Sequence, residues 1–433
     1  MTFISKNHAL DTLVQTHLER LTAYERLNAS AILAGIEQGK MVLLGNPAHP
    51  ELVPILVGQP ARVKVNANIG TSPLCDNPAE EAVKLAIALK AGADTIMDLS
   101  IAGNLPEIRK QLIAACPRPL GTVPIYAVAQ KYIDRGEDPA HFQTEELLAE
   151  IRLQAEQGVD FMTLHCGITR RNATLALGGG RSMGIVSRGG SILARWIKLN
   201  GQENPLLVHF QEILEICRTH NVTISMGDAL RPGAGTDAGD AAQWDEMIVL
   251  GGMLEEARQA GVQCMVEGPG HVPLHQVQSQ IITAKRLSCG APLYVLGPLT
   301  IDSSPGHDHI AGAIGGALAV QAGADFLCYL TPAEHLALPD REDVRQGVIA
   351  SRIAAQAGET ALERPWALER ERAMNLARFS LNWSEMQKAA IDPETVCARQ
   401  KNLDTGGVCS MCGEFCAVKM ARNQKWQPDK RNV

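Results

Sequence analysis

The sequence predicts an α/β fold, a TIM-type (β/α)8 barrel with an N-terminal cap and a C-terminal helical extension. Three observations support this prediction. Short apolar segments alternate with longer amphipathic ones across residues 62–330, polar or glycine-rich residues follow nearly every apolar segment, and hydrophobic residues make up 45% of the 433. Such alternation indicates a parallel sheet covered by helices, and the apolar content is enough for one large core.

The apolar segments are short and rich in Val, Ile, Leu and Met, with few polar residues. Strands that are covered on both faces have this composition. There is one segment more than a barrel of eight strands needs, so one is expected not to form a strand. The candidate strands are residues 62–66, 94–99, 121–126, 160–165, 184–187, 223–227, 263–267, 293–296 and 325–330.

Several segments between the strands carry helical periodicity and end signals. Residues 80–91, 144–157 and 243–260 are each followed directly by a glycine, and the second has acidic residues in its first turn. Acidic residues at the start and glycine after the end are typical of helix boundaries. These three segments are therefore predicted to be helices.

Polar residues after the strands distinguish a barrel from the alternative, a doubly wound open sheet. In a barrel all strand carboxyl ends open onto one face, where the active site lies. An open sheet would place such residues mainly near one switch point. Their presence after nearly every strand favours the barrel. The polar stretches begin at Asn68, Asp98, His165, Ser187, Gly227 and Glu267.

The chain is predicted to have three parts. Residues 1–60 have the character of an N-terminal cap of helix and loop, and residues 61–362 contain all the strand signals. Residues 363–433 are more charged and more helical, and they end in a group of cysteines. We therefore expect a catalytic barrel between a short cap and a helical extension.

Charge and hydropathy exclude two kinds of partner. The formal net charge is −7, so no global basic field is present to hold nucleic acid. No apolar run approaches the roughly 18 residues that span a membrane, and residues 1–11 lack the apolar region of a signal peptide. We therefore expect a soluble, cytoplasmic protein that binds neither nucleic acid nor membrane.

Three of the eleven cysteines lie close together near the C-terminus. Cys409, Cys412 and Cys416 form the pattern C-x2-C-x3-C, and no further Cys or His follows them. A structural zinc site needs four ligands, whereas a [4Fe–4S] cluster held by three thiolates leaves one iron open. S-adenosylmethionine (SAM) can bind such an iron and be cleaved reductively to a 5′-deoxyadenosyl radical. A zinc knuckle completed from elsewhere and a redox-active tail are the alternatives.

Nine segments, spread in order over roughly residues 40–420, carry distinctive motifs. They are VNANIGTS (65–72), MDLS (97–100), GTVPIY (121–126), GIVSRGGS (184–191), GDALRPG (227–233), EGPGHVP (267–273), LGPLT (296–300), TPAEHLALP (331–339) and CSMCGEFC (409–416). Together they resemble the phosphomethylpyrimidine synthase family of thiamin biosynthesis, a radical SAM family with a relative that makes 5-hydroxybenzimidazole for anaerobic cobalamin synthesis.

The resemblance implies a (β/α)8 barrel that rearranges 5-aminoimidazole ribotide (AIR) by radical chemistry. It also implies a [4Fe–4S] cluster, SAM, an external low-potential electron donor, and a divalent metal, zinc or iron. A homodimer is expected, in which the cluster segment covers a barrel mouth.

Matching positions give the site residues that the resemblance implies. His271 and His335 match the protein ligands of the divalent metal, and Cys409, Cys412 and Cys416 match the cluster ligands. The positions that match substrate contacts are Asn68, Met97, Tyr126, His165, Ser187, Arg188, Gly189, Asp228, Ala229, Leu230, Arg231, Glu267 and Tyr294. An Arg beside glycine amides also suits a ribotide phosphate on physical grounds.

Three departures from the family motifs bear on the product. Ile101 replaces a Thr of the family, Ala229 replaces a Gly, and His307 replaces a Tyr. A radical rearrangement depends on which atoms are held close, so a reshaped cavity can change the product. The departures favour a lyase that converts AIR to 5-hydroxybenzimidazole, with 5′-deoxyadenosine, methionine, formate and CO released. The alternative is phosphomethylpyrimidine synthase, which makes 4-amino-2-methyl-5-phosphomethylpyrimidine from AIR.

Two hypotheses from other classes remain at this stage. In one, the C-terminal cysteines bind zinc only to stabilise a non-catalytic scaffold. In the other, the barrel is a zinc hydrolase that uses His271 and His335 as ligands and Glu267 as the base.

Overall fold

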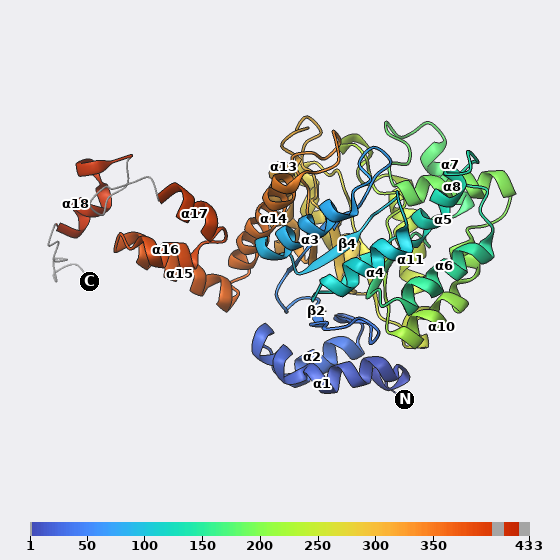
Figure 1. Ribbon diagram of the computed structural model, residues 1–433, viewed down its shortest axis with the longest axis horizontal. Coiled ribbons are helices and arrows are strands. Elements are labelled where there is room, and N and C mark those ends of the chain that lie inside the picture. The colour runs from blue at the N-terminus through green and yellow to red at the C-terminus, as the bar shows by residue number, and fades with distance from the viewer. Residues whose placement is uncertain (1, 401–410, 424–433) are drawn as a thin grey trace. The chain divides into compact units, whose positions relative to one another are not determined.

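A computed structural model describes residues 2–400 and 411–423 of the chain. Its centre is a closed barrel of eight parallel strands in the order β10-β3-β4-β5-β6-β7-β8-β9, ringed by helices (Figure 1). The predicted TIM-type barrel is confirmed. The strands are β3 (Lys64–Ile69), β4 (Thr95–Asp98), β5 (Leu120–Thr122), β6 (Phe161–Leu164), β7 (Thr223–Met226), β8 (Cys264–Glu267), β9 (Leu293–Leu296) and β10 (Phe326–Cys328).

The ninth predicted strand, residues 184–187, is wrong. This segment is a loop that leads into helix α8 (Arg188–Asn200), and Ser187 is the N-cap of that helix. The Ser187 side chain accepts a hydrogen bond from the backbone N–H of Gly190 at 3.2 Å. The segment therefore serves as the entry to a helix and pairs with no strand of the barrel.

Aromatic side chains fill the barrel interior. The rings of Tyr294 and Phe326 stack with centroids 4.3 Å apart, and Phe161 meets Phe326 edge-on at 6.3 Å. Gly121 makes room for this packing, since a Cβ there would lie 2.3 Å from the Phe161 ring. The interior is therefore a packed core, and ligands are restricted to its carboxyl-terminal mouth.

The three predicted helices are present as α3 (Pro78–Ala91), α6 (Thr144–Glu156) and α11 (Ala241–Ala260). Gly92, Gly158 and Gly261 follow them with φ of 99°, 99° and 76°, the left-handed conformation that ends helices. The other helices around the barrel are α4 (Leu105–Ala115), α5 (Pro124–Ile133), α7 (Arg170–Leu177), α8, α9 (Pro205–Val208), α10 (Phe210–His220), α12 (Val277–Leu287), α13 (Asp308–Ala322) and α14 (Arg341–Ala361).

The N-terminal segment closes the opposite end of the barrel from the mouth. Helices α1 (His8–Glu25) and α2 (Ala29–Glu37) are followed by an antiparallel pair that the sequence did not predict, β1 (Val42–Leu44) with β2 (Ile55–Val57). At the start of β3 the Lys64 ammonium forms a buried ion pair with Glu25 at 3.0 Å. These contacts tie the segment to the first residues of the strands.

Residues from 359 onward form a second compact unit. It contains α15 (Pro365–Phe379), α16 (Trp383–Ala389), α17 (Pro393–Gln400) and α18 (Ala417–Asn423), so this part is helical as expected. The proposed three-part division of the chain stays a prediction. Within the described ranges, no helix combines the length and the apolar character that crossing a membrane requires.

Candidate active site

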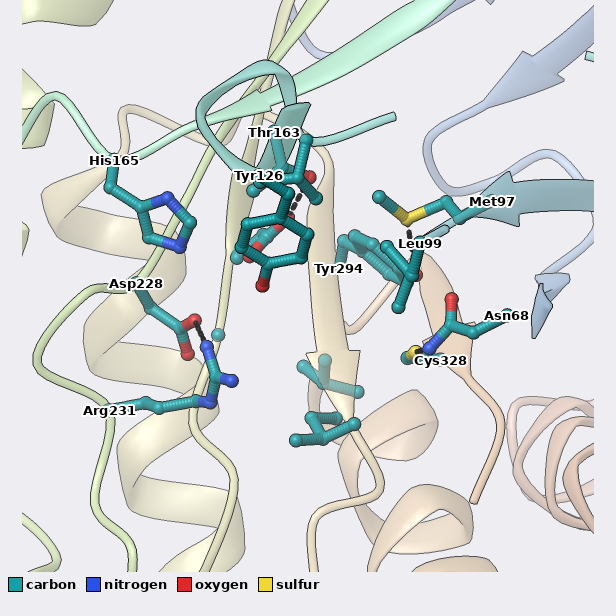
Figure 2. Close-up of a pocket in the computed structure, with 15 residues that line it drawn as sticks. Asn68, Met97, Leu99, Tyr126, Thr163, His165, Asp228, Arg231, Tyr294 and Cys328 are labelled. Atoms are coloured by element: carbon teal, nitrogen blue, oxygen red, sulfur yellow. Dashed lines mark hydrogen bonds and ion pairs between the residues drawn. The ribbon is translucent and has the colours of Figure 1, made fainter. Parts of the chain in front are cut away.

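Polar side chains from six strands or the loops after them surround a cavity of about 90 Å³ at the barrel mouth. Figure 2 shows His165, Tyr126 and the Asp228–Arg231 pair on one side of this cavity, facing Asn68 and Met97 on the other. The residues predicted to contact substrate that line it are Asn68, Met97, Tyr126, His165, Asp228, Arg231, Glu267 and Tyr294. Positions far apart in the sequence therefore meet at one site.

His165 follows β6 and is held by the first turn of α8. Its Nε2 lies 3.0 Å from the Ser187 Oγ. Gly189 lets the ring approach, since a Cβ there would lie 2.4 Å from the imidazole. Burial, together with the charge of Arg231, lowers the pKa of His165 to about 3. The imidazole is therefore neutral at physiological pH and exchanges hydrogen bonds in its uncharged form.

An ion pair after β7 supplies opposite charges to the cavity. The Arg231 Nη1 donates to the Asp228 Oδ1 at 3.0 Å (Figure 2). Burial raises the pKa of Asp228 to about 8, although the charge of Arg231 opposes that shift. Asp228 therefore changes charge close to physiological pH.

Glu267, at the end of β8, supplies a second carboxyl group. Its Oε1 accepts hydrogen bonds from the hydroxyl groups of Thr163 at 2.7 Å and Ser225 at 2.9 Å. Burial raises the pKa of Glu267 in spite of these two donors. The site thus offers a carboxyl group that can hold a proton.

A second cavity of about 300 Å³ adjoins the first, and Asn68 and Leu99 line both. Arg188 lines the second cavity, and its guanidinium lies 4.9 Å from the centroid of the Tyr126 ring. His335 also lines it. Arg188 therefore connects the two cavities through a cation–π contact.

Ala229 and Leu230 lie outside both cavities. Both are fully buried, and neither lines either cavity. Their predicted contact with substrate stays a prediction, as do the roles of the other predicted site residues.

His271 and His335 come together although they are distant in the sequence. Their ring centroids lie 5.3 Å apart. The His271 Nδ1 is 2.8 Å from Asp302 Oδ1, and the His335 Nδ1 is 3.4 Å from Asp308 Oδ2. Carboxylates on Nδ1 orient metal-binding histidines so that Nε2 is left for the ion.

This donor set fits a divalent metal, as the sequence predicts. It supplies only two ligands, because no group of three or more His, Cys, Asp or Glu side chains suited to a metal occurs within residues 2–400 and 411–423. A metal held by His271 and His335 would therefore need its remaining ligands from solvent or a bound molecule.

Two of the three predicted cluster ligands lie in the described residues. A single turn, η4 (Gly413–Phe415), separates Cys412 from Cys416, and the Cys416 N–H donates to the Gly413 carbonyl at 3.2 Å. Cys409 lies outside the described residues, so the complete set stays a prediction.

The sequence reasoning did not single out several residues that line the cavities. Cys328, at the end of β10, lines the first cavity and accepts a hydrogen bond from the Asn68 side chain at 3.2 Å. Burial raises the pKa of its thiol to about 11. Its place inside the predicted strand 325–330 gave no sign that it would reach the barrel mouth. Lys84 and Glu334, which line the second cavity, carried no signal either.

Comparison with known proteins decides the family. Residues 5–423 match the radical SAM ThiC family. The chain belongs to this family. It is 47% identical to the phosphomethylpyrimidine synthase of Moorella thermoacetica, covering 95% of this chain and 96% of the relative, and 45% identical to that of Methanopyrus kandleri, covering 94% and 95%. A dihydropteroate synthase structure from Xanthomonas albilineans has a TM-score of 0.44 at 13% identity, covering 75% of this chain and all of that one.

Membership of the radical SAM ThiC family makes this chain a lyase-type radical SAM enzyme. It also implies an iron–sulfur cluster and SAM. The expectations of a zinc hydrolase and of a non-catalytic scaffold are therefore set aside. The homodimer and the electron donor stay predictions.

Proposed function

We propose that this chain is a phosphomethylpyrimidine synthase, which converts AIR to 4-amino-2-methyl-5-phosphomethylpyrimidine. This was the second choice from sequence alone. Its support is that relatives with this name match almost the whole chain, including one from Dehalococcoides mccartyi that is 48% identical over 410 residues. The relative from Methanopyrus kandleri carries the same name.

The observation that carries the proposal is the set of groups around the two adjoining cavities. A ribotide presents a phosphate, ribose hydroxyl groups and a flat imidazole. The guanidinium of Arg188 beside the first turn of α8 suits the phosphate, and the carboxyl groups of Asp228 and Glu267 suit hydroxyl and amino donors. The Tyr126 ring suits a planar base.

The departures that favoured 5-hydroxybenzimidazole lie mostly away from this cavity. Ala229 is fully buried and packs against Gly190, where a Cβ would lie 2.9 Å from the Ala229 Cβ. His307 lines neither cavity, and Ile101 lines only the second. Two of the three departures therefore give no reason for a changed product. Synthesis of 5-hydroxybenzimidazole remains a second candidate, supported by Ile101 alone.

The residues have distinct proposed roles in the reaction. When bound, the cluster and SAM supply the radical that takes a hydrogen atom from the ribotide. The Asp228–Arg231 pair and Asn68 hold the ribose and base in place within the closed barrel mouth. Neutral His165 and the Glu267 carboxyl group accept or return protons as the ring is rebuilt. His271 and His335 would hold a metal that acts as a Lewis acid on a bound oxygen or nitrogen.

Product analysis tests the proposal. The enzyme is reconstituted under anaerobic conditions and given AIR, SAM and dithionite, and the products of one turnover are identified by mass spectrometry. The pyrimidine phosphate is expected, together with 5′-deoxyadenosine. The Cys412→Ala variant, as the matched control, should give neither. Finding 5-hydroxybenzimidazole in place of the pyrimidine would establish the second candidate.

A further inference from the structure

The loop after β7, residues 227–233, carries Asp228 and Arg231 into the cavity, and side chains from outside the loop bind both the backbone N–H and the carbonyl of Leu230. The Leu230 N–H donates to Glu246 Oε2 at 2.7 Å. The Leu230 carbonyl accepts from Arg181 Nη2 at 2.6 Å. Both of these side chains are buried. The buried side chains of Glu246 and Arg181 thus both bind the backbone of Leu230. This residue lies between Asp228 and Arg231, which face the cavity.

Further hydrogen bonds hold the Arg181 guanidinium in place. Arg181 donates from Nε and Nη2 to the two carboxylate oxygens of Asp240, at 2.6 and 2.8 Å, and from Nη1 to the Gly184 carbonyl at 3.1 Å. Asp240 is also the N-cap of α11, because its side chain accepts from the Gln243 N–H. Bidentate pairs of this kind fix the guanidinium plane.

Glu246 lies on α11 and contacts the neighbouring loop as well. A Cβ on Gly167 would lie 2.9 Å from the Glu246 Cγ, so the acid packs directly under the residues that follow His165. The same helix therefore supports the loops that bear His165, Asp228 and Arg231.

We propose that Arg181 and Glu246 are positioning residues, which fix the backbone on both sides of Leu230 so that Asp228 and Arg231 meet the anionic ribotide. Neither residue lines either cavity, so they act through the loop. The inference rests on the proposed function for the identity of the ligand. An unsupported loop would leave the ion pair free to rotate out of the cavity, and small misplacements of this kind are costly.

The neutral form of Glu246 is favoured by its surroundings. Burial raises its pKa well above the ordinary value, although the hydrogen bond from Leu230 opposes that shift. The Glu246 Oε1 has no hydrogen-bond partner among the described residues. A glutamine can therefore replace the acid, keeping an acceptor for the Leu230 N–H.

The test measures the dissociation constants of AIR and of SAM for the intact, cluster-loaded enzyme. Glu246→Leu removes the acceptor and should weaken AIR binding on the order of tenfold or more, with SAM binding unchanged. Glu246→Gln should bind AIR within about twofold of the wild type, as a conservative rescue. Glu255→Gln, on the exposed side of the same helix, is the matched control.

A second set of variants distinguishes a positioning role from simple misfolding. Arg181→Lys keeps the charge but loses the fork and should weaken AIR binding by an intermediate amount. Because both residues bind the backbone of the same residue, Leu230, combining Arg181→Lys with Glu246→Leu should weaken binding by less than the product of the single effects. Full additivity, or equal loss of AIR and SAM affinity together with a lower Tm, would overturn the positioning role. Failure of wild-type enzyme to bind AIR would instead refute the proposed function.

Discussion

The imidazole rings of His271 and His335 lie 5.3 Å apart, and each presents its Nδ1 to its own aspartate. Asp302 follows β9 in the chain, whereas Asp308 begins α13 and accepts a further hydrogen bond from the Ser304 hydroxyl at 2.9 Å. His335 adopts a left-handed backbone with φ of 62°, which is uncommon for a residue other than glycine. Two separate segments therefore converge to orient one pair of rings.

Removing either carboxylate should weaken metal binding. Asp302→Asn and Asp308→Asn are each expected to reduce affinity for a divalent metal by about 10–100-fold, because the histidines lose their fixed orientation. Metal content after dialysis against a graded chelator measures the effect. Glu215→Gln, an exposed position on α10, should retain the metal of the wild type. Equal metal retention in all variants would contradict the orienting role.

Gly189→Ala should disable the site without unfolding the protein. The new methyl group would lie 2.4 Å from the His165 ring and displace it, while alanine is favourable within the helix. We expect turnover of AIR to fall by about 100-fold with an unchanged Tm. Gly180→Ala is the control, since a Cβ there has open space around it. Wild-type turnover by Gly189→Ala would show that the ring position is unimportant.

Sequence reasoning could reach the barrel because buried parallel strands are nearly uniformly apolar. The same property explains its one false strand. Residues 184–187 are apolar enough for a strand, but the cap at Ser187 commits them to a helix start. The pair β1–β2 was missed because the sequence predicts a cap of helix and loop over residues 1–60.

Contacts across the site were beyond sequence reasoning for a different reason. The 3.0 Å contact between His165 and Ser187 depends on how α8 docks at the mouth, which no local pattern encodes. Arg181 gave no signal, because charged residues in loops are usually solvated. Eight of the thirteen substrate-contact positions that the family resemblance implies line the first cavity, and only the geometry shows that the other five, such as Ala229, do not.

Replacing Ile101 with the family's threonine should leave the product unchanged. Ile101 lines only the second cavity, so the first cavity keeps its shape in Ile101→Thr. Mass spectrometry of the products should show the same single compound for the variant, the wild type and an exposed control, Ile314→Thr on α13. A new product from Ile101→Thr alone would mean that this position selects between the two reactions.

Binding of AIR should depend on pH through Asp228. Its pKa is raised to about 8 by burial, so the group is neutral below that pH and negative above it. While Asp228 is neutral, the charge of Arg231 is free to attract the anionic ribotide. Affinity is therefore expected to fall as pH rises through about 8. Dissociation constants measured from pH 7 to 9 test this, and Asp228→Asn should remove the dependence; an identical slope in that variant would assign the effect elsewhere.

Asp160 should be sensitive to substitution, because it links several segments at the closed end of the barrel. Its carboxylate is fully buried and accepts hydrogen bonds from the backbone N–H groups of Asn46 and Leu120, each at 2.7 Å, and it lies 2.7 Å from His49 Nδ1. It thereby joins β5, β6 and the N-terminal segment. Asp160→Asn presents an amide where only acceptors are wanted, so it should lower the free energy of unfolding by about 2–4 kcal/mol.

Urea unfolding of the two proteins measures this difference. Asp134→Asn, at an exposed position after α5, should stay within about 0.5 kcal/mol of the wild type. Asp160 lies far from the barrel mouth, so the Asp160→Asn variant should bind AIR with unchanged affinity below the unfolding transition. The substitution therefore tests stability independently of binding. A variant as stable as the wild type would mean that the amide finds new partners and that the carboxylate does not anchor the N-terminal segment.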